Sequence, residues 1–97
     1  MNKMIMVVYN EAVDQEVMEA VEDCGIAGYT KTLAVFGKGA ASGTHLGNDI
    51  WPGRNNMLFI ACEDKESKQL LIRIRNLRKT IGREGVKAFI LPIEDVT

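Results

Sequence analysis

Two short segments of this chain share one design, and their repetition constrains the fold more than any other feature. Met4 to Tyr9 (MIMVVY) and Met57 to Cys62 (MLFIAC) are continuous apolar runs that are too short for helices. Each is followed closely by a polar residue that can cap a helix, so MIMVVYNEA parallels MLFIACEDK. We therefore expect two buried strands, each leading directly into a helix.

The segments that follow both strands have helical apolar periodicity. Asn10 can cap the segment from Glu11 to Cys24, and Gly25 supplies a natural stop. Asp64 can cap a second helix, whose basic C-terminal half ends at Gly82. The expected apolar stripes are Val13, Val17, Ala20, Val21 and Cys24 in the first helix and Leu70, Leu71, Ile74, Leu77 and Ile81 in the second.

Two further segments complete a pair of βαβ halves. Tyr29 to Phe36 is rich in β-branched and aromatic residues. Val86 to Ile93 is another apolar run, in which Pro92 indicates an edge or an irregular end. This order of elements predicts an α+β fold, a ferredoxin-like βαββαβ sandwich with both helices on one face of an antiparallel sheet. With 97 residues, the chain is expected to form a single domain over residues 1–97.

The composition of the strands predicts an oligomer. An antiparallel sheet with one face in water should alternate apolar and polar residues, but MIMVVY, MLFIAC and AFIL do not alternate. The face left uncovered by the helices is therefore expected to be apolar, and such a patch normally marks an interface. We infer a homo-oligomer whose subunits pack sheet against sheet. A buried helix mistaken for strands is the alternative, which the shortness of the runs disfavours.

The loop between the second and third strands, Gly37 to Asn56 (GKGAASGTHLGNDIWPGRNN), is unusually long for so small a domain. It contains five of the nine glycines and the only histidine and tryptophan. Connections longer than about 12–15 residues are uncommon unless they are functional or disordered. We therefore expect this loop to carry function. Trp51 is either an anchor that returns the loop to the sheet or a contact for a partner, and we favour the anchor.

Composition and charge argue against several classes of function. A net charge of −1 gives no general attraction to nucleic acid, and no RNP-like aromatic pattern occurs. No apolar run approaches the ~20 residues of a membrane span, so direct membrane insertion is not expected. No nucleophile has a neighbouring base, so we do not expect an enzyme. The N-terminus does not resemble a signal peptide, and the expected location is the cytoplasm.

His45 is the only candidate for a metal ligand, with Asp49 nearby. One imidazole and one carboxylate are too few for a closed site in one chain, although three loops meeting in a trimer could supply more. We prefer a solvated or partner-contacting histidine and assign no metal site. Cys24 and Cys62 have no metal-binding spacing and are interpreted as reduced, buried thiols.

Three local sequences resemble the P-II family of signalling proteins. They are CGIAGYT before the second strand, VFGKG where that strand enters the loop, and TIGREGVKAFILPIEDV at the end of the chain. The resemblance covers nearly the whole chain and implies a homotrimer of ferredoxin-like subunits, each projecting a long T-loop between its second and third strands. In that family a small-molecule effector binds in the clefts between subunits, and the T-loop then docks on or leaves a partner such as a membrane transporter or an enzyme.

The resemblance also implies which residues contact ligands. Gly37 and Lys38 match positions where the family's backbone approaches a nucleotide, and glycine permits close approach. The segment from Gly82 to Lys87 matches a second glycine loop that could hold phosphate oxygens; equally, its glycines could only end a helix and make a turn. The implied nucleotide-binding set is Thr30, Gly37, Lys38, Gly82, Arg83, Gly85 and Lys87, and the implied partner-binding set is Ser42, Gly43, His45, Asp49 and Trp51.

An adenine nucleotide is therefore the candidate effector. The sequence ends at Thr97, before the C-terminal arginines that nucleotide-binding members use, so nucleotide binding stays an open question at this point. The alternative function is divalent-metal binding of the kind found in the CutA family of metal-tolerance proteins, which shares the trimeric ferredoxin-like architecture.

Overall fold

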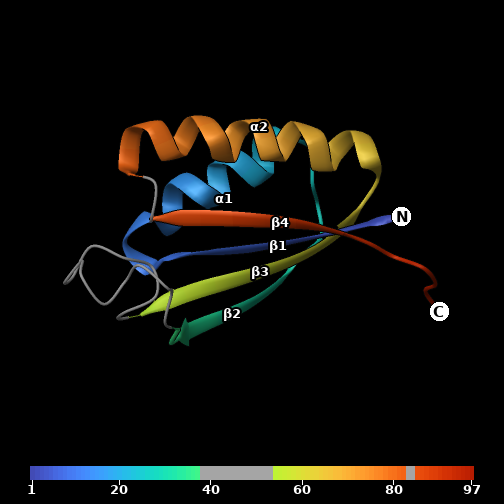
Figure 1. Ribbon diagram of the computed structural model, residues 1–97, viewed down its shortest axis with the longest axis horizontal. Coiled ribbons are helices and arrows are strands. Elements are labelled where there is room, and N and C mark those ends of the chain that lie inside the picture. Colours follow the sequence, from blue (N-terminus) through green and yellow to red (C-terminus); the bar gives the residue numbers. More distant parts are fainter. Residues whose placement is uncertain (38–53, 83–84) are drawn as a thin grey trace.

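The computed structural model, which describes residues 1–37, 54–82 and 85–97, contains one sheet and two helices in two layers (Figure 1). The strand order is β2-β3-β1-β4, and all three pairings are antiparallel. This is the ferredoxin-like arrangement, so the predicted fold class is confirmed. The elements are β1 (Lys3–Asn10), the 3-10 turn η1 (Glu11–Val13), α1 (Asp14–Asp23), β2 (Thr30–Val35), β3 (Asn55–Cys62), α2 (Asp64–Ile81) and β4 (Val86–Pro92).

Local side-chain chemistry explains where the helices begin and end. Asn10 caps η1 as predicted, because its side-chain oxygen accepts the N–H of Ala12 at 2.9 Å. Gly25 has a φ of 74°, which ends α1 in a conformation that glycine adopts at little cost. The predicted cap of α2 is wrong by one residue. Glu63 is the cap and forms a capping box with Glu66, which accepts the Glu63 N–H at 2.9 Å.

Two predicted boundaries also differ from the structure. The first helix does not run from residue 11, since η1 occupies its expected first turn. The long loop does not extend to Asn56, because Asn55 and Asn56 already belong to β3 and pair with Asn10 and Tyr9 of β1. Asparagine is depleted in strands, but here pairing with β1 outweighs that preference.

The core lies between the helices and one face of the sheet. Ile5, Val7 and Tyr9 alternate along β1, and each is at most 1% exposed. Leu58 and Ile60 lie opposite them on β3 and are equally buried. Fully burying an aliphatic side chain of this size contributes roughly 1.5–3 kcal/mol relative to its exposed state. The helices complete the cluster with Val17, Ala20, Val21, Leu70 and Ile74.

The opposite face of the sheet is not covered by α1 or α2 (Figure 1). The register places Met4, Met6, Val8, Met57, Phe59, Phe89 and Leu91 on this open face. Phe59 and Phe89 are each 36% exposed, and Leu91 is 45% exposed. Most side chains that β1, β3 and β4 place on this face are apolar, as predicted, whereas a solvated face would alternate with polar residues. Asn55 and Lys87 are polar exceptions, and β2 adds Thr30 and Thr32 at the edge. β4 is an edge strand, as Pro92 indicated, and it ends at Pro92, one residue before the predicted end at Ile93.

Neither of the described helices has both the length and the apolar character needed to cross a membrane.

Candidate functional site

A cavity of about 210 Å³ lies on the open face, where β2 ends and β3 begins. Its walls are apolar side chains of β1, β3 and β4, together with the segment from Val35 to Gly37 that leads into the long loop. Asn55 is the polar side chain in this lining. An apolar hollow with one fixed polar group is the usual construction of a small-molecule site.

Asn55 is 1% exposed, and strand alternation directs its side chain to the face that carries the cavity, opposite that of Asn56. Neither its amide nitrogen nor its oxygen has a hydrogen-bond partner within the described part of the chain. Buried polar groups are nearly always paired in native proteins, so such a side chain requires an explanation.

A cation lies at the margin of the same cavity. Lys87 pairs with Val8 across the β1–β4 ladder, and Val8 lines the cavity. The ammonium of Lys87 lies 5.7 Å from the ring centroid of Phe89, which is also in the lining. A cation over an aromatic face is attracted by about 0.5–1 kcal/mol at an exposed site. The ring thus holds a positive charge beside the cavity.

The structure brings some of the sequence-predicted ligand residues together and separates others. Gly37 lines the cavity and Lys87 lies beside it. Thr30 is at the far end of β2, where it pairs with Phe59, four positions along β3 from Asn55. Lys38 and Arg83 lie outside the described residues, as do the predicted partner-binding residues Ser42, Gly43, His45, Asp49 and Trp51.

Gly82 and Gly85 have the structural roles considered from the sequence. Gly82 ends α2 with a φ of 99°, and its N–H donates to the carbonyl of Arg78. Gly85 lies in the bend before β4, and its carbonyl accepts the N–H of Asn10 at 2.9 Å. A side chain at Gly85 would meet Ile81 at 3.3 Å, so close packing also favours glycine there.

A second, shallow hollow of about 630 Å³ lies at the C-terminal end of α2 and is lined by Arg75, Arg78, Lys79 and Gly82. Arg78 and Lys79 lie in the last turn of α2, where the partial negative charge of the helix end favours cations. They also concentrate positive charge next to the bend that contains Gly85.

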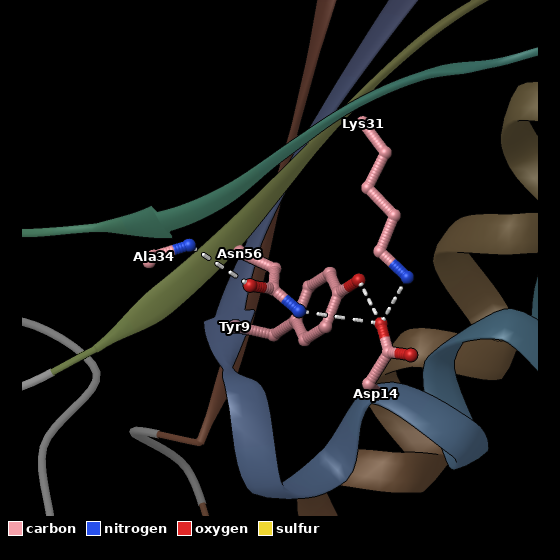
Figure 2. A network of polar contacts seen from close by, with 5 residues as sticks. All are labelled: Tyr9, Asp14, Lys31, Ala34 and Asn56. Atoms are coloured by element: carbon pink, nitrogen blue, oxygen red, sulfur yellow. Dashed lines mark hydrogen bonds and ion pairs between the residues drawn. The ribbon is translucent and has the colours of Figure 1, made fainter.

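On the helix side of the sheet, a polar network is centred on Asp14 at the start of α1 (Figure 2). One oxygen of its carboxylate, Oδ1, accepts the Tyr9 hydroxyl at 2.6 Å and lies 2.6 Å from the Lys31 ammonium. The side-chain amide of Asn56 donates to the same oxygen at 3.4 Å. Three strands are thereby fastened to one carboxylate.

The network continues to the end of β2. The side-chain oxygen of Asn56 accepts the backbone N–H of Ala34 at 3.3 Å (Figure 2). Ala34 has a φ of 55°, and the β2–β3 register shifts between Thr32 and Val35. This bulge interrupts the ladder, and Asn56 supplies a partner for the Ala34 N–H. The bulge directs the chain into the segment that lines the cavity.

Ionisation strengthens the same network. Burial, and then the hydrogen bond to Asp14, raise the pKa of Tyr9 well above its usual value, so its hydroxyl stays a donor. Burial tends to raise the pKa of Asp14, but hydrogen bonds from Lys31 and Tyr9 outweigh it and lower that pKa. Near neutral pH the network therefore contains an ionised carboxylate and suits a structural role.

The described residues offer little for metal or thiol chemistry. Residues 1–37, 54–82 and 85–97 contain no group of three His, Cys, Asp or Glu side chains that could hold a metal ion. Cys24 and Cys62 are free thiols, and burial raises the pKa of both. A thiol with a raised pKa is a poor nucleophile. Cys62 is buried as expected, whereas Cys24 is only partly buried.

The sequence matches the family model described as nitrogen regulatory protein P-II over residues 2–97. A comparison with curated proteins found no match. The family match favours the P-II resemblance over the CutA alternative.

Solved structures of PII-like proteins have the same fold. CPII from Thiomonas intermedia K12, bound to ADP, AMP and bicarbonate, aligns with a TM-score of 0.72 at 17% identity, over 95% of this chain and 89% of that one. CPII bound to ADP, AMP and acetate gives 0.74 at 18% identity, over 95% and 85%. A putative PII-like signalling protein from Thermus thermophilus gives 0.68 at 21% identity, over 95% and 86%.

Proposed function

The chain belongs to the nitrogen regulatory protein P-II family, and from this premise we propose that it is a cytoplasmic, non-enzymatic regulator. It binds a small effector at the clefts between subunits and controls a partner protein, such as a transporter or an enzyme, through the loop between β2 and β3. The observation that carries the proposal is the position of the cavity. Its wall, from Val35 to Gly37, is also the base of that loop.

The proposed assembly is a homotrimer that packs the open faces together. Phe59, Phe89 and Leu91 leave a substantial part of their surface exposed on one face. Contiguous apolar surface of this kind is characteristic of interfaces. Association would cover the open face and place the cavity next to a neighbouring subunit.

The proposed effector is an adenine nucleotide. A cavity of about 210 Å³ with apolar and aromatic walls suits a flat base, and Lys87 provides a cation at its margin for a phosphate group. Gly37 lets a ligand approach the backbone, and the CPII structures contain ADP and AMP. Gly82 and Gly85 would let a phosphate group approach the backbone close to Lys87, and Arg83, outside the described residues, stays a predicted ligand. Thr30 could serve only a cleft completed by another subunit, because it lies at the far end of β2.

A change in the effector would shift the loop between conformations with different affinities for the partner. Such a shift requires that the ligand bind the two conformations with different free energies. The position of Val35 to Gly37 supports such coupling, because these residues line the cavity and lead directly into the loop.

Calorimetric titration with ATP, ADP and AMP tests the proposal. Wild-type protein should bind at least one of them, and Lys87→Gln should weaken binding about tenfold through loss of a charge-assisted contact. Lys65→Gln is the matched control, because it removes an exposed cation from α2, which does not line the cavity. Absence of binding by the wild-type trimer, or equal losses in both variants, would contradict the proposed effector site.

A further inference from the structure

Asn55 and Asn56 are adjacent, but in the described part of the chain only the Asn56 side chain makes hydrogen bonds. Asn56 makes hydrogen bonds to Asp14 and Ala34 on the helix side of the sheet. Asn55 faces the cavity with both polar atoms inaccessible to solvent and without a partner in the described residues. The two side chains are chemically identical, so their different environments must come from position alone.

Packing does not explain an amide at position 55. The surrounding lining includes Met6, Val8, Val35 and Met57, among which a leucine of the same branched shape would bury more apolar surface. A buried amide in such surroundings is unfavourable unless something completes its hydrogen bonds. Because Asn55 lines the cavity, a rotation of its side chain would bring the carboxamide within reach of a ligand there.

The chemistry of a carboxamide defines the ligand group. The side chain is uncharged and presents an N–H donor beside a carbonyl acceptor in one plane. Its complement is a flat group with an acceptor beside a donor. The edge of adenine has this pattern, and asparagine pairs with that edge through two hydrogen bonds in DNA recognition. Hydrogencarbonate, whose O–H lies beside a carboxylate oxygen, has it as well.

We propose that Asn55 is the specificity-determining residue of the cavity and selects a ligand group that carries a hydrogen-bond donor next to an acceptor. This inference rests on the proposed effector site. It adds which ligands that site would distinguish, namely those with the donor from those without it. Lys87 contributes charge at the margin, but a cation attracts any anion. Only the carboxamide distinguishes a ligand with the donor from one of the same shape without it.

The test compares matched ligands in NMR titrations of the oligomer. Adenosine is paired with N6,N6-dimethyladenosine, and hydrogencarbonate with acetate, because the second member of each pair lacks the donor. In one pair the wild type should prefer the donor-bearing ligand about 5- to 150-fold. Asn55→Leu and Asn55→Ala, which both lack the oxygen that accepts from this donor, should remove this preference. The responding pair identifies whether the source is a base or a small acid.

Asn76→Ala, on an exposed part of α2, is the control and should keep the wild-type preference. The proposal is overturned if wild type does not discriminate within either pair, or if both Asn55 variants discriminate as wild type does. It is also overturned if both variants dissociate the oligomer in sedimentation, since the amide would then serve the subunit contact. Nucleotide binding that persists unchanged in the Asn55 variants would refute this inference alone and leave the proposed function intact.

Discussion

The side-chain oxygen of Asn56 accepts the backbone N–H of Ala34 at 3.3 Å, so β3 holds the bulge in which β2 ends. The same side chain donates to Asp14, which places the bulge, β3 and the start of α1 in one network. The cavity wall begins one residue after Ala34. Asn56 is therefore a positioning residue for the base of the loop.

Asn56→Ala should lower the free energy of unfolding by about 1–3 kcal/mol. The substitution leaves the Ala34 N–H without its acceptor and removes one of the donors to the Asp14 carboxylate. Urea unfolding followed by circular dichroism measures the change. Asn76→Ala is the control, since Asn76 is exposed on α2. Equal losses in the two variants would show that the network does not stabilise the fold.

Ala34 should tolerate glycine better than a typical strand alanine does. Its φ of 55° costs an L-residue roughly 1–2 kcal/mol, whereas glycine loses about 0.5–1 kcal/mol in chain entropy. Ala34→Gly is thus expected to be neutral or to stabilise by up to about 1 kcal/mol, and Ala34→Val to destabilise, since a β-branched residue disfavours this region.

Ala61→Gly is the matched control for this pair, because Ala61 lies in β3 and does not have a positive φ. It should destabilise by about 0.5–1 kcal/mol in the same thermal or urea measurement. If Ala34→Gly costs as much as Ala61→Gly, the positive φ imposes no strain that matters.

The sequence predicted the elements whose apolar residues follow one pattern over many positions. It missed the residues that join a strand only because a neighbouring strand pairs with them. Apolar runs, helical stripes and stop residues together specified all four strands and both helices. The C-terminal end of the loop was misplaced because Asn55 and Asn56 carry no strand signal of their own. They join β3 because Tyr9 and Asn10 of β1 are available to pair with them.

The candidate site was predicted only in part for the same reason. Gly37 and Lys87 were identified from local similarity, and both lie at the cavity. Asn55 and the Asp14 network were missed, because residues 42 positions apart in sequence, such as Asp14 and Asn56, leave no periodic pattern. The nearest available signal was two consecutive asparagines directly before an apolar run.

Asp14→Asn should weaken the dependence of the unfolding free energy on pH at acid pH. The pKa of Asp14 is lowered from 3.8 in the folded state, so the unfolded chain binds a proton first as the pH falls. The stabilisation is fully present above about pH 4 and is lost as the pH falls through the folded pKa. The difference in unfolding free energy between wild type and Asp14→Asn should therefore shrink below about pH 4.

Urea unfolding at a series of pH values from 2 to 7 measures this effect. Glu94→Gln, which removes an exposed carboxylate near the C-terminus, shows the general effect of deleting one acidic group. A wild-type advantage over Asp14→Asn that stays constant down to pH 2 would contradict the lowered pKa.

Tyr9→Phe should weaken the dependence of the unfolding free energy on pH at alkaline pH. Burial, and then Asp14, raise the pKa of Tyr9 above 10.0, so at high pH the unfolded chain loses this proton before the folded one. Wild-type stability should then fall as the pH rises beyond about 10, and Tyr9→Phe should lose less over that range. Tyr29→Phe, at a tyrosine that is 48% exposed, is the control and should leave the alkaline slope of wild type in place.

Phe59→Lys should dissociate the proposed trimer. Phe59 lies on the open face of β3 and is 36% exposed, so its ring is available to an adjoining subunit. Replacing an apolar interface residue with a charge forfeits roughly 1.5–3 kcal/mol of burial per subunit and adds the cost of desolvating an ammonium. Ile72→Lys makes the same change on α2, at a side chain that is 56% exposed and belongs to the opposite layer. Sedimentation velocity should show a smaller species for Phe59→Lys and the wild-type species for Ile72→Lys. A monomeric wild type, or dissociation only by Ile72→Lys, would place the interface elsewhere and remove the clefts on which the effector site depends.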